Sequence, residues 1–168
     1  MRYIRMAFFA ILILFLILTA IGWMFPSTVR TTRAVDIHAP FDSVYKYLDD
    51  PKYWKKWMAG ADSNTITFLS TNTSGPGTLI KMGTGEVKIT RESEDTIFSV
   101  WRSAGGQVLN AAFVPFIPKN QNVVTVQWYF EKSVNWYPWE RLGSLSNDKV
   151  LGPVIEESLK NLKKALED

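Results

Sequence analysis

Apolar residues dominate the start of the chain. Residues 6–25 carry no charge and no strongly polar group, and as a helix rising about 1.5 Å per residue they would cross the roughly 30 Å hydrocarbon layer of a membrane. Trp23 lies near the end of this stretch, where an indole suits the membrane interface. The pattern predicts one transmembrane helix, which divides the chain into an anchor at residues 1–26 and a domain at residues 27–168.

A cleaved signal peptide is the alternative interpretation of this stretch. Signal peptides normally have an apolar region of about 7–15 residues that ends in a small-residue cleavage site. Here the apolar run is longer, and the weak site at residues 20–22 is followed at once by bulky residues. We therefore expect an uncleaved anchor. Two arginines before the span favour an exported domain, but Arg30 and Arg33 follow it, so the orientation stays open.

Beyond Pro26 the hydrophobic pattern changes to a period of two. Residues 28–38 alternate in this way, which predicts a strand. One face of that strand would carry Val29, Thr31, Val35 and Ile37.

Two short helices are expected after this strand. Asp42 or Ser43 can cap the first of them, because their side chains accept from free backbone N–H groups. Pro51 suits the start of the second, which would hold the aromatic segment DDPKYWKKWM at residues 49–58.

The rest of the chain predicts six more strands and a long helix. Turn residues separate the strands, which are expected at residues 66–70, 78–82, 86–90, 96–102, 107–116 and 123–131. Apolar residues three and four apart then predict a helix from Asn147 to Glu167. Its apolar face would consist of Leu151, Ile155, Leu159, Leu162 and Leu166, widened by Val154.

Two stretches of the domain carry a resemblance to a known family. VDIHAPFDSVYKYLDDPKYWKKWM, residues 35–58, resembles the opening of the START-like (SRPBCC) superfamily, including its polyketide cyclase/dehydrase-like branch. IEESLKNLKKALE, residues 155–167, is similar to the family's closing helix. Together with the element order, the resemblance covers residues 29–168. It implies an α+β helix-grip fold, in which a seven-stranded curved antiparallel sheet wraps around the C-terminal helix and encloses an apolar cavity.

Packing considerations agree with such a cavity. A single helix about 10 Å wide cannot fill the concavity of seven curved strands, so a gap between them is expected. The resemblance implies that the second helix lies at the rim of the cavity, where Trp54 and Trp57, three residues apart, would point together over the gap as a lid or rim. A helix on the membrane surface is an alternative for this segment, because Trp and Lys suit a membrane interface. Plain core packing is the alternative for every candidate, because protein interiors are close-packed. The ligand-binding candidates are Trp54, Trp57, Met58, Val87, Ile89, Val126, Trp128, Phe130, Leu151, Ile155 and Leu159.

A second aromatic cluster precedes the last helix. It has the sequence NWYPWERLG at residues 135–143. This cluster could line the other rim of the cavity, or it could hold the start of the helix.

The composition is that of a globular chain without thiol chemistry. Hydrophobic residues make up 46% and aromatic residues 14%, and the absence of cysteine excludes disulfides, a thiolate nucleophile and a cysteine-based zinc site. The formal net charge is +3, but without Arg2 and Arg5 the chain has 17 basic and 16 acidic residues. This near-neutral domain argues against a nucleic-acid partner.

Candidate catalytic groups are scarce. His38 is the only histidine, and no carboxylate cluster accompanies it, so we expect no metal and no other cofactor. We interpret His38 as a surface residue at a strand end. With one histidine and no nucleophile-elbow pattern, the sequence offers no catalytic residues of the nucleophile–base kind.

Three functions stay open at this point. The resemblance implies a membrane-anchored module that binds a hydrophobic small molecule or lipid. A cyclase- or dehydratase-like enzyme acting in the same cavity is an alternative, and a partner-docking domain without ligand is another. Polar groups for such an enzyme could come from Arg91, Arg102, Asn110, Gln127 and Tyr129, although the alternation with Trp128 and Phe130 places Gln127 and Tyr129 on the opposite face.

Overall fold

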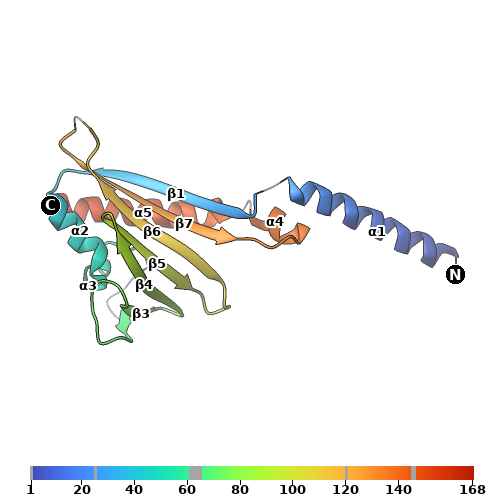
Figure 1. Ribbon diagram of the computed structural model, residues 1–168, viewed down its shortest axis with the longest axis horizontal. Helices are drawn as coiled ribbons and strands as arrows, with labels where there is room; N and C mark the ends of the chain where they lie inside the picture. The colour runs from blue at the N-terminus through green and yellow to red at the C-terminus, as the bar shows by residue number, and fades with distance from the viewer. Residues whose placement is uncertain (1, 25, 61–65, 120, 145–146) are drawn as a thin grey trace.

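The computed structural model describes residues 2–24, 26–60, 66–119, 121–144 and 147–168 (Figure 1). It contains a long N-terminal helix, one strand, two short helices, six strands and two helices. Their bounds are α1 (Arg2–Trp23), β1 (Thr28–Ile37), α2 (Phe41–Asp49), α3 (Pro51–Trp54), β2 (Ile66–Phe68), β3 (Leu79–Met82), β4 (Gly85–Ser93), β5 (Thr96–Arg102), β6 (Val108–Phe116), β7 (Val124–Ser133), α4 (Pro138–Ser144) and α5 (Asn147–Glu167).

The seven strands form one antiparallel sheet in the order β1-β7-β6-β5-β4-β3-β2. After β1 the chain crosses to the far edge of the sheet through α2 and α3, and it then returns strand by strand until β7 pairs with β1. α5 runs along the sheet beside β1 (Figure 1). The expected architecture, a seven-stranded sheet around a long C-terminal helix, is therefore confirmed.

The buried face of α5 follows the expected spacing. Ile155, Leu159 and Leu162 are almost completely buried, and Leu151 and Leu166 pack against the same core. The expected widening of this face by Val154 is wrong, because that side chain is 47% exposed.

The buried face of α5 also contains a polar residue, Ser158. The Ser158 hydroxyl donates to the carbonyl of Val154 at 2.7 Å and accepts from the backbone N–H of Ala59 at 2.9 Å. Ser158 therefore ties the segment that follows α3 to the middle of α5, with its own polar group satisfied.

An ion pair holds the start of α5 against β1. Arg33 lies on the inner face of β1, and its guanidinium binds both oxygens of Asp148 at 3.1 Å. This bidentate contact lowers the pKa of the Asp148 carboxyl. Gly152 leaves room for the guanidinium, because a Cβ at that position would collide with the Arg33 side chain.

The two short helices differ in detail from the expectation. α2 begins at Phe41 with Pro40 as its N-cap and no side-chain cap, so the expected capping by Asp42 or Ser43 is wrong. α3 ends at Trp54, and Trp57 lies in the turns that follow. The Asp50 carboxylate caps α3 by accepting from the N–H of Lys52 at 2.9 Å.

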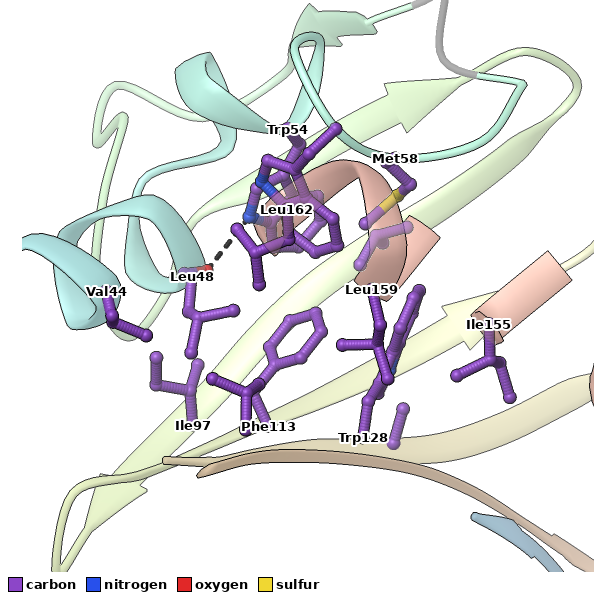
Figure 2. Packing of buried hydrophobic residues seen from close by; sticks show 14 of the residues in the cluster. Val44, Leu48, Trp54, Met58, Ile97, Phe113, Trp128, Ile155, Leu159 and Leu162 are labelled. Carbon is purple, nitrogen blue, oxygen red and sulfur yellow. Dashed lines mark hydrogen bonds between the residues drawn. The ribbon is translucent and has the colours of Figure 1, made fainter. Parts of the chain in front are cut away.

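Aromatic rings fill the space between α3 and the sheet. Trp54, Trp57, Trp101, Phe113 and Trp128 form a contiguous set, which we call the aromatic core, with ring centroids 4.9–6.5 Å apart. Figure 2 shows Trp54, Phe113 and Trp128 packed among aliphatic residues of α2 and α5. Such offset and edge-on ring contacts add to the free energy gained by burial.

Both indoles of the α3 segment are core residues. Trp54 is 0% and Trp57 is 1% exposed. The Trp54 N–H donates to the carbonyl of Leu48 at 2.9 Å, and the Trp57 N–H donates to that of Tyr47 at 3.2 Å. The structure thus places them inside the core rather than at an exposed rim, and ligand contact by these two residues stays a prediction.

Truncation of Trp57 tests this placement. We expect Trp57→Ala to lower the free energy of unfolding by about 3–5 kcal/mol, because it removes a buried aromatic ring. Phe116→Ala, at a ring that is 42% exposed, is the control and should cost clearly less. Urea midpoints in mild detergent measure both variants. If Trp57→Ala lowers the free energy of unfolding no more than Phe116→Ala does, the placement of Trp57 in the core is contradicted.

Candidate functional site

An apolar pocket opens at one end of the inner face of the sheet. Its volume is about 210 Å³, and the ends of β3, β4, β5 and β6 surround it. The lining residues are Met82, Thr84, Gly85, Glu86, Val87, Trp101, Arg102, Ser103, Gln107 and Leu109.

The register of the strands assembles the apolar wall of this pocket. Val87 pairs with Trp101 and Trp101 with Leu109, so the three side chains lie side by side on the inner face. Gly85 allows the β3–β4 hairpin to approach, since a Cβ there would lie 2.8 Å from the carbonyl oxygen of Arg102. Neighbouring residues in the pleat point outward, which leaves the pocket wall apolar.

Trp101 connects the pocket to the aromatic core. Its ring stacks on Trp54 at 6.0 Å with an interplanar angle of 7°, and its edge meets Phe130 at 5.2 Å. Its N–H donates to the hydroxyl of Ser99 at 2.9 Å, which fixes the ring. The sequence candidates did not include Trp101, although alternation with Ile97 and Ser99 in the predicted strand places all three on one face.

The candidates chosen from the sequence fall in three places. Val87 lines the apolar pocket, and Leu159 lines a second hollow of about 380 Å³ between β1 and α5. Leu151 is half-buried against the core. The remaining candidates pack together in the core: Trp54, Trp57, Met58, Ile89, Val126, Trp128, Phe130 and Ile155.

One buried donor in this core lacks an acceptor. The indole N–H of Trp128 is buried and has no hydrogen-bond partner among the residues that the structure describes. Leaving such a group unpaired costs about 1–3 kcal/mol. An interior acceptor, from water or from a ligand, would satisfy it.

Comparison with known proteins assigns the domain to a family. Residues 28–167 match the sequence model of the family described as polyketide cyclase/dehydrase and lipid transport. The chain belongs to this family. Among proteins of curated function, none matches the chain in sequence.

Solved structures share the helix-grip fold of the family. BexL, a di-domain ARO/CYC from the BE-7585A biosynthetic pathway, is 14% identical with a TM-score of 0.65; the match covers 84% of this chain and 51% of BexL. Major latex-like protein 151 from Panax ginseng is 7% identical with a TM-score of 0.64, over 85% of this chain and all of that protein. A hypothetical protein from Helicobacter pylori is 15% identical with a TM-score of 0.61, over 82% and 88%.

The length of these relatives differs. This chain spans about half of BexL and also 47% of DynU16, a putative protein of the dynemicin biosynthetic locus, which is 12% identical with a TM-score of 0.59. At such identities the likeness concerns the fold, and the activity of a family member depends on its own site.

Most of the polar candidates for catalysis lie away from the family fold's inner face. Arg91 covers the outward ring of Phe98 at 4.3 Å, and Tyr129 lies beneath Arg30 at 3.8 Å. Asn110 is exposed, and Gln127 alternates with the buried residues of β7, as the sequence predicted. Of the five candidates, Arg102 alone lines the apolar pocket.

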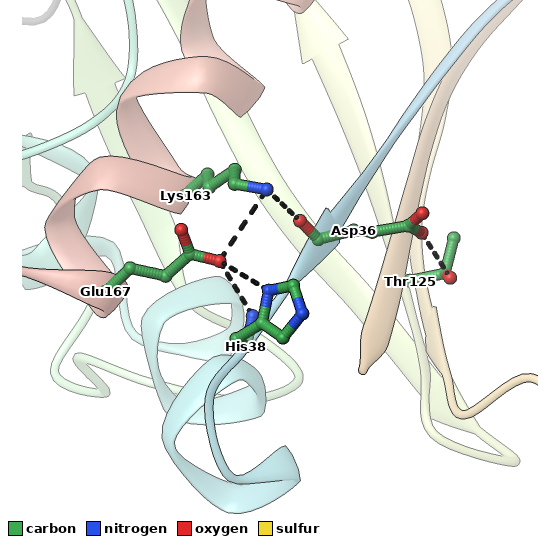
Figure 3. A network of polar contacts seen from close by, with 5 residues as sticks. All are labelled: Asp36, His38, Thr125, Lys163 and Glu167. Carbon is green, nitrogen blue, oxygen red and sulfur yellow. Dashed lines mark hydrogen bonds and ion pairs between the residues drawn. The ribbon is translucent and has the colours of Figure 1, made fainter. Parts of the chain in front are cut away.

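His38 belongs to a surface network that joins α5 to β1 (Figure 3). Its side chain is 68% exposed, which confirms it as a surface residue, and its backbone N–H donates to a Glu167 oxygen at 2.8 Å. That bond lowers the pKa of Glu167. Lys163 lies 3.7 Å from the same oxygen and donates to the carbonyl of Asp36 at 2.8 Å. Within the described ranges, no three His, Asp or Glu side chains form a metal-binding group.

A partly buried carboxyl pair lies where α2 meets β4. Asp49 accepts from the backbone N–H of Gly75 at 2.9 Å, and a buried oxygen of Glu92 lies beside the same glycine. Burial, reinforced by Glu92, raises the pKa of Asp49 to about 7. Burial also raises the pKa of the neighbouring Tyr45 hydroxyl. The pair is therefore best accommodated with a proton on Asp49.

This proton makes stability depend on pH. An unfolded Asp ionises near pH 4, so between about pH 4 and pH 7 the folded chain holds a proton that the unfolded chain has lost. The free energy of unfolding should therefore fall as the pH rises through this window. We expect Asp49→Asn to raise the urea midpoint at pH 8, and the gain to shrink as the pH approaches 4.

Asp42→Asn is the matched control, because Asp42 lies on the same helix and is exposed. It should show no such pH-dependent gain. An Asp49→Asn variant that is less stable than the wild type at pH 8 would show that the carboxylate stabilises the fold.

Proposed function

We propose that this protein is a membrane-anchored module that binds a hydrophobic small molecule or lipid, with the apolar pocket at the end of the sheet as its binding site. The observation that carries this proposal is the wall formed by Val87, Trp101 and Leu109, which offers an apolar surface beside an already filled core. Ligand sites are typically concave and apolar, with a few polar groups that orient the ligand.

The size of the pocket indicates how a ligand would bind. Sites for drug-sized ligands usually measure about 300–1,000 Å³, and this pocket is smaller. We infer that it takes a ring or the end of an acyl chain, while the rest of the ligand lies across the mouth. Glu86, Arg102, Ser103 and Gln107 surround that mouth and would bind the polar part of the ligand.

The polar groups of the pocket favour binding over catalysis. They lie at the mouth, where solvent reaches them, and the wall that would face a substrate is apolar. General acid–base catalysis needs a positioned proton donor or acceptor within hydrogen-bond reach of the reacting atoms. A cyclase-like enzyme would therefore depend on Arg102 and Glu86 at the rim, which is the weaker of the two proposals.

The membrane part of the proposal depends on α1. Among the described residues one helix, Arg2–Trp23, is long and apolar enough to cross a membrane, a test that a signal sequence also passes. A contact with the folded domain favours retention, because the Arg141 guanidinium donates to the carbonyl of Gly22 at 3.1 Å. In this proposal the arginines before α1 favour an exported domain. The anchor then keeps this domain next to the membrane, which is a source of apolar ligand.

Filling the pocket tests the proposal. We expect Leu109→Trp to reduce labelling by a photoreactive fatty acid about tenfold, which corresponds to about 1.4 kcal/mol, because the new ring occupies the ligand space. Val108→Trp is the matched control: it lies next in the strand, points away from the inner face and is 46% exposed. The measurements are the intact mass of the full-length chain in nanodiscs after irradiation and the masses of its proteolytic fragments, which locate the adduct.

The two variants separate the possible outcomes. Loss of labelling in Leu109→Trp alone, with an unchanged urea midpoint, would support the pocket as the binding site. If Leu109→Trp and Val108→Trp are labelled to the same extent, or if the adducts are confined to α1, the pocket is not the binding site. Absence of labelling in the wild-type chain would favour a partner-docking domain.

A further inference from the structure

The second aromatic cluster lies outside the core. Trp136, Tyr137 and Trp139 are 50%, 37% and 62% exposed. Their rings nevertheless stack on one another, with centroids 4.7 Å and 5.1 Å apart. Three exposed aromatic rings in four residues form an apolar surface that neither the core nor the pocket uses.

This cluster packs beside the anchor helix. The ring of Trp139 lies 6.5 Å from that of Phe15, and α4 contacts α1 (Figure 1). Gly22 is buried at the contact, where a Cβ would lie 3.5 Å from the Cα of Pro138. α4 therefore runs against the last two turns of α1 rather than beyond its end.

The position of Phe15 determines how deep this contact lies. Phe15 precedes Trp23 by eight residues, which is about 12 Å along a helix. If α4 stayed in water, only the part of α1 from Arg2 to Phe15 would be free to cross the membrane. Those 14 residues rise about 21 Å, which is less than the roughly 30 Å of the hydrocarbon layer. A membrane-spanning α1 thus requires α4 to enter the lipid.

The polar groups of the segment suit such a place. The Glu140 carboxylate accepts from the backbone N–H of Asn135 at 2.7 Å. The Arg141 guanidinium donates to the carbonyls of Asn135 at 3.2 Å and Gly22 at 3.1 Å. Both charged side chains thus bind backbone groups within the junction, as a water-poor environment demands.

We propose that residues 136–141 are a second membrane contact, embedded in the lipid leaflet beside α1, and that they hold the domain in a fixed orientation on the bilayer. This inference rests on the proposed anchoring by α1. It also concerns the ligand. Thr28 pairs with Ser133 at the end of β7, the start of β6 pairs with that end of β7, and Val108 at the start of β6 pairs with Arg102. The pocket therefore opens at the same end of the sheet as α1. The fixed domain would take its ligand from the leaflet that α4 enters.

Depth-dependent quenching tests the embedded segment. The chain has no cysteine, so single-cysteine variants of the full-length protein can carry one nitrobenzoxadiazole label each. The test position is Trp139→Cys, with Trp136→Cys as a second site in the same cluster. Trp23→Cys reports on the anchor, and Ile117→Cys is the control, because it is 59% exposed and lies at the far end of β6.

The quencher is doxyl-labelled lipid in vesicles of phosphatidylcholine and phosphatidylglycerol. We expect quenching at position 139 to be at least as strong as that at position 23, because Trp139 lies beside Phe15, about 12 Å farther along the anchor into the membrane, with little quenching at position 117. Quenching at 23 without quenching at 139 and 136 would overturn the embedded segment and leave the anchor standing. Absence of quenching at 23 would overturn the anchor and this inference together.

Discussion

The structure depends on the contact between five aromatic rings. Trp54 and Trp57 come from the α3 segment, Trp101 from β5, Phe113 from β6 and Trp128 from β7, and neighbouring ring centroids lie 4.9–6.5 Å apart. A curved sheet of seven strands is too wide for one helix to cover, and α5 lies mainly along β1. The rings fill the middle of the concave face, and the pocket remains where they end.

This arrangement explains why the core and the candidate site are neighbours. Trp101 belongs to both, since one side of its ring stacks on Trp54 and the ring also lines the pocket beside Val87 and Leu109. The pocket wall is therefore held by core packing, and it needs no separate support. Preorganised apolar walls of this kind reduce the entropic cost of binding.

Local sequence patterns predicted every element of the fold except α4. The period of two located β1, turn residues separated the six later strands, and the spacing of Ile155, Leu159 and Leu162 placed α5 from Asn147 to Glu167. These signals are local, because the direction of successive side chains within one helix or strand sets the spacing of the residues on its buried face. The pattern failed at Val154, which is 47% exposed, and it did not predict the buried Ser158, whose hydroxyl has two backbone partners.

The candidate site could be predicted only in part. Val87 was a candidate, but Trp101 and Leu109 join it through a pairing of three strands that periodicity does not define. The burial of Trp54 and Trp57 was equally open, because a short segment of alternating lysine and aromatic residues suits a rim as well as a core. Both indoles pack against Phe113 of β6, and this contact between segments far apart in the sequence places them inside.

The N-terminal helix α1, α4 and the pocket lie at the same end of the sheet. The Ser27 carbonyl accepts from the N–H of Val134 at 2.8 Å, so the start of β1 and the end of β7 meet at the end of the sheet next to α1. The pocket lies at that same end of the sheet, at β5 and β6. A ligand that leaves a bilayer would reach this pocket without crossing the domain.

The central claim is that the domain holds an apolar ligand, and native mass spectrometry of the full-length chain tests it most directly. The chain should be extracted from its membrane in mild detergent and measured before and after organic solvent. The account predicts an added mass of a hydrophobic small molecule or lipid that survives extraction and is released by the solvent. A bare chain that also takes up nothing from a total lipid extract would contradict the account.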